Sequence, residues 1–155
     1  MNDFFKKTRG GDIRATMLNF DSTANDATIQ PNGRTEKYRG EDVRDNPAYI
    51  IRLAEMYLIR AEAKGRTAGL ADLNAVRTKR GIYLITPTML ATDDAFRTAI
   101  LEERRAEFNF EGQRYFDLAR LRRLKTDIGV ADFRSIVPIP GREIKAAGLT
   151  QNPGY

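Results

Sequence analysis

The 155-residue chain contains no cysteine, no histidine and no tryptophan. Without cysteine it can form no disulfide, thiolate nucleophile or thiolate metal ligand. Histidine is the usual general base near neutral pH and the commonest metal ligand, so its absence argues against a hydrolase triad, a zinc site and a Glu-x-x-His di-iron site. We therefore expect no catalytic residue, no metal site and no cofactor.

Long hydrophobic runs are missing as well. No apolar stretch approaches the length of about 20 residues that a membrane-spanning helix needs. The first ten residues, MNDFFKKTRG, carry charges but no apolar core of a secretory signal, so we expect no signal peptide in this chain. The net charge is +5, but 21 acidic residues are interleaved with 26 basic ones, which does not favour nucleic-acid binding.

Two parts of the chain differ in their pattern. Residues 1–47 are rich in Gly, Asn, Asp and Pro and keep no helical period, so we expect an irregular lead-in that belongs to the same domain as the rest. Helix signals begin at Asn46-Pro47, an N-cap and first-turn pair. The segment that follows, up to Gly65 as a stop, has apolar residues at helical spacing: Ile50, Leu53, Ala54, Tyr57, Leu58 and Ala61.

Further helices are expected downstream. The segment LADLNAVRTKRG predicts a helix ending at Gly81, and a three-residue connection to the preceding helix would form an antiparallel hairpin. Thr92 or Asp93 caps a third helix, Gly112 interrupts it, and QRYFDLARLRRLK forms a fourth helix or a kinked continuation. The tail is extended apart from a short helical turn at residues 142–147. Two hairpins about 44 residues apart favour an all-α fold with tetratricopeptide-like hairpins.

The segment LEERRAEFNFEGQRYFDLARLRR, residues 101–123, places charges on an apolar helix face. Residues seven apart lie within about 20° of each other, so we expect Phe96, Glu103 and Phe110 to form one row. Glu107 shares a row with Ile100 and, if the helix continued regularly, with Arg114. Buried carboxylates are stabilised by guanidinium groups. We therefore expect Glu103 and Glu107 to pair with arginines on the neighbouring helices, and the candidates are Arg52, Arg60, Arg77 or Arg114. The predicted structural ion-pair residues are Arg52, Glu55, Arg77, Glu103, Glu107 and Arg114.

Two functional interpretations of this segment are less favoured. Glu103 and Glu107 lie one turn apart on one helix, too nearly parallel to flank a scissile bond, and neighbouring arginines lower carboxylate pKa values where a general acid needs a raised one. The basic run at residues 120–125 could grip nucleic acid, but Asp117 and Asp127 would repel phosphates. Arginine near a helix C-terminus also complements the helix dipole.

Four segments of the chain stand out in order: IRLAEMYLIRAEA (Ile51–Ala63), LNAVRTKRGI (Leu73–Ile82), ILEERRAEFNFEGQRYFDLARL (Ile100–Leu121) and PIPGREI with LTQNPGY (Pro138–Tyr155). Taken in this order, they make the chain similar to the SusD/RagB family of outer-membrane nutrient-binding lipoproteins. Two shorter segments, GDIR at residues 11–14 and EKYRG at residues 36–40, fit the family's pattern weakly.

The resemblance implies a helical-repeat domain over residues 48–155, the C-terminal part of a longer protein on the outer face of an outer membrane. Such a protein binds glycans or other nutrients without catalysis and partners a SusC-like TonB-dependent transporter. This chain lacks the family's signal peptide and lipidated cysteine, and no sugar-binding residue can be carried over. The alternative is a free-standing tetratricopeptide-like interaction module without sugar binding. If a larger part normally covers these helices, the chain exposes an apolar patch and self-associates.

Overall fold

The computed structural model describes residues 11–17, 37 and 50–155. Within these residues every regular element is helical, which confirms the all-α prediction. The chain divides into two compact units, Met1–Gly112 and Gln113–Tyr155. The domain boundary expected after residue 47 and the N-cap expected at residue 46 lie outside the described residues.

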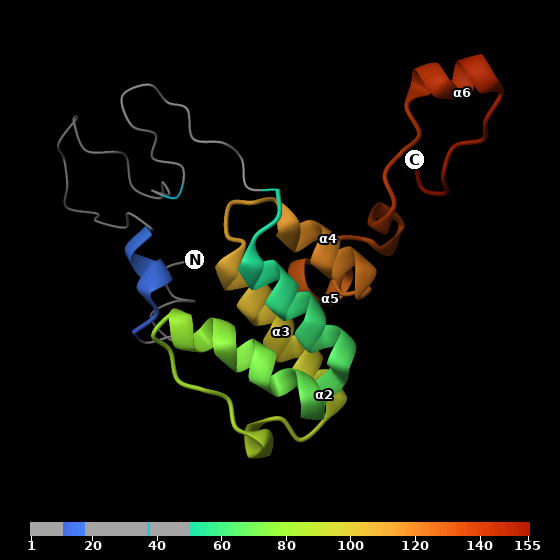
Figure 1. Cartoon of the computed structure of the whole chain (residues 1–155). Coiled ribbons are helices and arrows are strands. Elements are labelled where there is room, and N and C mark those ends of the chain that lie inside the picture. The colour runs from blue at the N-terminus through green and yellow to red at the C-terminus, as the bar shows by residue number, and fades with distance from the viewer. Residues whose placement is uncertain (1–10, 18–36, 38–49) are drawn as a thin grey trace, which may run out of the picture. The chain divides into compact units, whose positions relative to one another are not determined.

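The first long helix, α2 (Leu53–Lys79), folds back on itself at Gly65 (Figure 1). Gly65 has φ 73° and ψ −178°, a conformation that essentially only glycine adopts without strain. The two arms, residues 53–64 and 66–79, then run antiparallel. They approach so closely that a Cβ on Gly69 would lie 2.1 Å from the carbonyl oxygen of Ala61. The predicted hairpin is confirmed, but one residue joins its arms and not three.

The prediction that residues 50–52 are helical is wrong. Residues 50–52 precede the helix, and Arg52 is its N-cap in extended conformation. Because the chain is not yet helical at Ile50, that side chain is not carried onto the core face and is 82% exposed. Leu53, in the first turn, is 73% exposed, whereas Leu58 and Ala61 are fully buried as the helical period predicts.

Helix α3 (Asp93–Glu107) packs against α2. The side chain of Thr92 accepts a hydrogen bond from the backbone N–H of Ala95 (3.1 Å), so Thr92 is the N-cap. The Thr92 hydroxyl thereby satisfies one of the backbone N–H groups at the start of α3 that have no partner within the helix. The shared core of α2, α3 and the loop between them contains Leu58, Ala61, Leu73, Val76, Leu90, Phe96, Ile100 and Phe108.

Asn74 fixes the loop that joins α2 to α3. Its amide nitrogen donates to the carbonyl of Ile85 (2.8 Å), and its amide oxygen accepts from the N–H of Ile85 (2.9 Å). The Asn74 side chain thereby supplies the two backbone hydrogen bonds of Ile85 that a neighbouring strand would supply in a sheet. The loop contains the short 3-10 helix η2 (Pro87–Met89).

A short N-terminal element, η1 (Ile13–Met17), also belongs to the first unit. The N–H of Ile13 donates to the carbonyl of Arg80 (3.1 Å), just beyond the end of α2. Gly11 and Gly81 lie close together there, since a Cβ on either would sit 3.4 Å from the other's carbonyl oxygen. Both glycines have positive φ.

The second unit holds α4 (Gln113–Arg120), α5 (Leu124–Ile128), η3 (Asp132–Ser135) and α6 (Gly141–Ala147). Helix α6 confirms the helical turn expected near the C-terminus. The last residues fold back on the extended segment before α6: Gln151 accepts from the N–H of Ile139 and donates to its carbonyl, while the Tyr155 hydroxyl donates to Ile136. No helix in the described part of the chain has the length and apolar character needed to cross a bilayer.

Candidate functional site

The most prominent polar feature of the first unit is a buried cluster of carboxylates and guanidiniums around the last two turns of α3. We call this set the ion cluster: Asp12, Arg14, Lys37, Arg52, Arg77, Arg80, Glu103, Glu107 and Glu111. Helix α3 carries Glu103 and Glu107 toward the core because they follow Phe96 and Ile100 at a spacing of seven. Charged groups at such positions need partners within the protein.

Glu103 is fully buried and is held from two sides. Arg14 donates from Nη2 to Oε1 (2.8 Å), and Arg77 donates from Nη1 to Oε2 (2.8 Å). Arg77 also donates from Nε to the carbonyl of Tyr83 (3.0 Å), and its guanidinium lies over the Tyr83 ring. Arg77 therefore links α3, the end of α2 and the following loop.

Glu107 is 3% exposed and binds three arginines. Arg80 donates from Nε to Oε2 (2.8 Å) and from Nη2 to Oε1 (2.6 Å), a bidentate pair. Arg14 and Arg52 each donate one further hydrogen bond of 2.8 Å. Burial alone would raise the pKa of Glu107, but the hydrogen bonds and charges of these arginines lower it to about 2. The carboxylate is therefore ionised throughout the physiological range.

The C-terminal carbonyls of α3 are also satisfied by cations. Arg52 Nη2 and Lys37 Nζ donate to the main-chain oxygen of Glu107 at 2.8 and 3.0 Å, and Lys37 also donates to the carbonyl of Asn109 (3.1 Å). Both cations pair with the carboxylate of Glu111. A helix end carries unpaired carbonyls and partial negative charge, so cations placed there stabilise it.

Four of the six predicted ion-pair residues come together in the ion cluster, as the contacts above show. These are Arg52, Arg77, Glu103 and Glu107. Glu55 lies 3.7 Å from Arg104, whose guanidinium also stacks over the Phe108 ring.

Two of the arginines offered as partners have other roles. The row from Ile100 through Glu107 does not extend to Arg114, because α3 ends at Glu107 and both Phe110 and Gly112 have positive φ. Arg114 lies 3.6 Å from Asp127. Arg60 makes a bidentate pair with Asp72 (2.8 and 2.7 Å).

Asp12, Arg14 and Arg80 were not predicted to take part. Arg14 is 89 residues away from Glu103 in sequence, and no periodicity connects a short turn to a distant helix. The weak GDIR match was the only signal that pointed to this segment. Arg80 follows the last helical residue of α2, so the apolar stripe of that helix does not include it.

The ion cluster suits a structural role better than proton transfer. A general acid needs a pKa near the working pH, whereas the pKa of Glu107 is lowered to about 2. The hydrogen bonds join separate segments of the chain: η1, Lys37, the N-cap residue of α2, the second arm of α2 and α3. The carboxylates therefore serve as fixed anchors for arginines.

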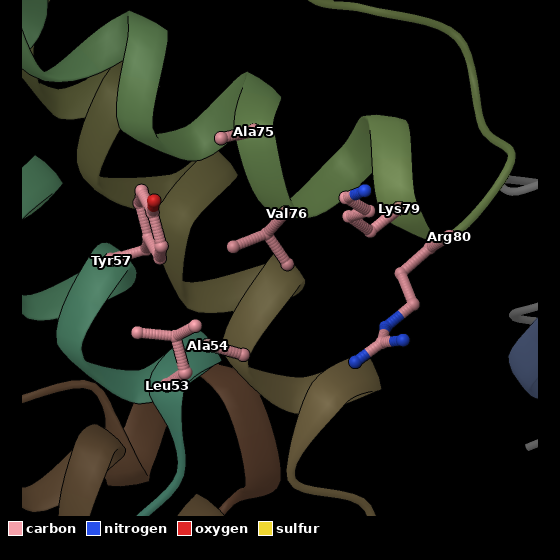
Figure 2. Close-up of a pocket in the computed structure, with 7 residues that line it drawn as sticks. All are labelled: Leu53, Ala54, Tyr57, Ala75, Val76, Lys79 and Arg80. Carbon is pink, nitrogen blue, oxygen red and sulfur yellow. The ribbon is translucent and has the colours of Figure 1, made fainter.

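A pocket of about 440 Å³ opens between the two arms of α2. Figure 2 shows residues of the first arm facing residues of the second across this space. Its lining is Leu53, Ala54, Tyr57, Ala75, Val76, Lys79 and Arg80. The guanidinium of Arg60 already lies over the Tyr57 ring (5.1 Å). The walls are mainly apolar and carry few of the hydrogen-bonding groups that would recognise a sugar, so we do not assign this pocket to a glycan.

Comparison with known proteins identifies the fold. A SusD-like protein from Bacteroides fragilis NCTC 9343 is 30% identical over 70% of this chain and 26% of its own, with a TM-score of 0.60. A laminarin-binding SusD-like protein is 39% identical over 75% of this chain and 25% of its own, with a TM-score of 0.58. A SusD superfamily protein from Bacteroides thetaiotaomicron VPI-5482 matches 97% of this chain and 39% of its own at 24% identity, with a TM-score of 0.73, which shows a shared fold.

These similarities cover only part of each relative. The chain spans between 25% and 39% of the length of the three solved proteins. A search of curated proteins found no match. The model of the SusD family matches residues 14–132, which include all but the first residue of η1, the α2 hairpin, α3, α4 and α5. The chain therefore belongs to the SusD family.

Proposed function

We propose that this chain is part of a glycan-binding protein that acts without catalysis at the surface of an outer membrane. The observation that carries the proposal is the family match over residues 14–132, together with 39% identity to a laminarin-binding SusD-like protein. The carboxylates of the ion cluster are paired with arginines, which fits a structural role and gives no support to acid–base chemistry.

The partner in this proposal is a TonB-dependent transporter of the SusC type. The binding protein would capture an oligosaccharide or polysaccharide and deliver it to the transporter, with a lipid anchor on the longer form holding it at the membrane. The described part of this chain supplies helical packing for that protein. The glycan-contacting residues belong to other parts of it.

The test uses the full product of the gene. Native gel electrophoresis through immobilised laminarin and a panel of neutral and acidic polysaccharides should retard the protein on at least one of them, compared with a non-binding protein in the same gel. A transporter gene should lie next to this one, and its product should co-purify from detergent-solubilised membranes. A protein that binds no polysaccharide but associates tightly with a soluble protein would favour a tetratricopeptide-like interaction module instead.

A further inference from the structure

The contact between η1 and the helices has the form of a ligand in a binding site. Arg14 is 6% exposed and reaches both buried glutamates of α3 from a segment about 90 residues earlier. Nη1 donates to Glu107 Oε2 and Nη2 to Glu103 Oε1, each at 2.8 Å. The guanidinium thus bridges two carboxylates that lie one helical turn apart.

Asp12 organises this arginine before it meets α3. It accepts from Arg14 Nε (2.8 Å), from Arg14 Nη2 (2.7 Å) and from the backbone N–H of Arg14 (3.0 Å). Asp12 and Arg14 together are neutral, so their entry brings no net charge into a buried site. Pairing inside the segment also lowers the cost of removing the guanidinium from water.

The backbone also takes part in this attachment. Ile13, between the two charged residues, is 50% exposed. Its N–H donates to the carbonyl of Arg80 (3.1 Å), and the close approach of Gly11 to Gly81 leaves room for this hydrogen bond. A guanidinium, a carboxylate and a backbone N–H therefore combine within four consecutive residues.

The receiving side is built by the helices themselves. Arg77 holds the second oxygen of Glu103, while Arg80 and Arg52 hold Glu107. These arginines orient the two carboxylates and limit their repulsion. The carboxylates present Oε1 of Glu103 and Oε2 of Glu107 to Arg14.

We propose that Glu103 and Glu107, oriented by Arg77 and Arg80, form a binding site for a Gly-Asp-x-Arg peptide segment. In this structure residues 11–14 of the same chain occupy the site. The ligand class is an arginine held by an aspartate two residues earlier, and covalent connection to the helices is not required for recognition.

The test separates the segment from the site. A full-length chain carrying Asp12→Gly and Arg14→Gly keeps the receiving residues and loses the ligand. Its melting temperature should fall by about 10 °C, because two buried carboxylates lose a partner. A synthetic peptide of residues 8–18 at about 1 mM should restore at least half of this loss. Fluorescence anisotropy of the labelled peptide should show saturable binding to the variant and none to the wild-type chain, whose site is filled.

Matched peptides test the recognition itself. An Arg14→Lys peptide keeps the charge but loses the planar fork of donors that meets Asp12, Glu103 and Glu107 together, and an Asp12→Asn peptide keeps the shape but not the inner ion pair. Each should bind at least tenfold more weakly than the natural sequence. Equal binding of the three peptides, or binding to variant and wild type alike, would overturn the proposal. If the variant chain does not fold, the peptide added during refolding should recover folded protein, and failure to do so also counts against a separable site.

Discussion

Replacing Glu107 by glutamine tests the structural role of the ion cluster most directly. The substitution keeps the size of the side chain and removes a charge that Arg14, Arg52 and Arg80 share. A fall of the pKa from 4.5 to about 2 corresponds to about 3 kcal/mol, at about 1.4 kcal/mol for each tenfold change in proton affinity. Removing one partner of a buried ion pair typically costs about 3–5 kcal/mol. The two estimates agree, so we expect Glu107→Gln to lower the free energy of unfolding by about 3 kcal/mol.

The measurement is urea unfolding followed by far-ultraviolet circular dichroism. The midpoint should fall while the slope with urea stays constant, since the change lies in the folded state. Glu102→Gln is the matched control: Glu102 is half-buried on the same helix, 3.5 Å from Arg105, and such pairs contribute at most about 0.5 kcal/mol. If the free energy of unfolding of Glu107→Gln lies within about 0.5 kcal/mol of the wild-type value, the arginines do not depend on this carboxylate and the structural interpretation fails.

Four other predictions concern helix packing, the loop, acid stability and the exposed face. Gly69→Ala should destabilise by about 1–3 kcal/mol by forcing apart the α2 arms, whereas Gly141→Ala, with open space around it, should not destabilise; thermal melts compare them. Asn74→Ala should speed amide hydrogen exchange at Ile85 and lower the free energy of unfolding by about 1–3 kcal/mol, and unchanged exchange would show that Asn74 does not fix the loop. Because the pKa of Glu107 is lowered on folding, its contribution is complete above about pH 5 and is lost as the pH falls toward 2; a flat urea midpoint across that range would contradict this. The apolar residues Ile50, Ile51, Leu53 and Met56 are exposed, so sedimentation should show self-association that Met56→Lys weakens, and a wild-type monomer at high concentration would count against it.

Local patterns in the sequence predicted most of the helices. The apolar period predicted the first arm of α2, and Gly65 was predicted to end it, which is where the arms turn. Thr92 or Asp93 was predicted to cap α3, and Thr92 is the N-cap. These signals are local, since a cap or a positive φ depends on neighbouring residues. Ile50 was wrongly assigned to the helix because an apolar residue that precedes a helix can match the spacing of the helix's apolar residues without itself being helical.

The ion cluster was only partly predictable for the same reason. Helical period placed Glu103 and Glu107 on the buried face, but it could not choose among their possible partners. Arg60 was an equal candidate on spacing, yet it faces Asp72 on the second arm. The turn at Phe110 and Gly112 removed Arg114 from the row, and Arg14 enters from a segment that no local rule connects to α3.

Several residues in the segments that resemble the SusD family have internal roles in the structure. Asn74 fixes a loop, Arg77 and Glu103 pair in the core, and Gly112 takes a positive φ before α4. A change at any one of these leaves a buried group without its partner or strains the backbone. A side chain that touches only a surface ligand can change alone, at no cost to folding. A family signature built from such internal contacts therefore identifies the scaffold, and the identity of the ligand has to be sought on surfaces that the signature does not include.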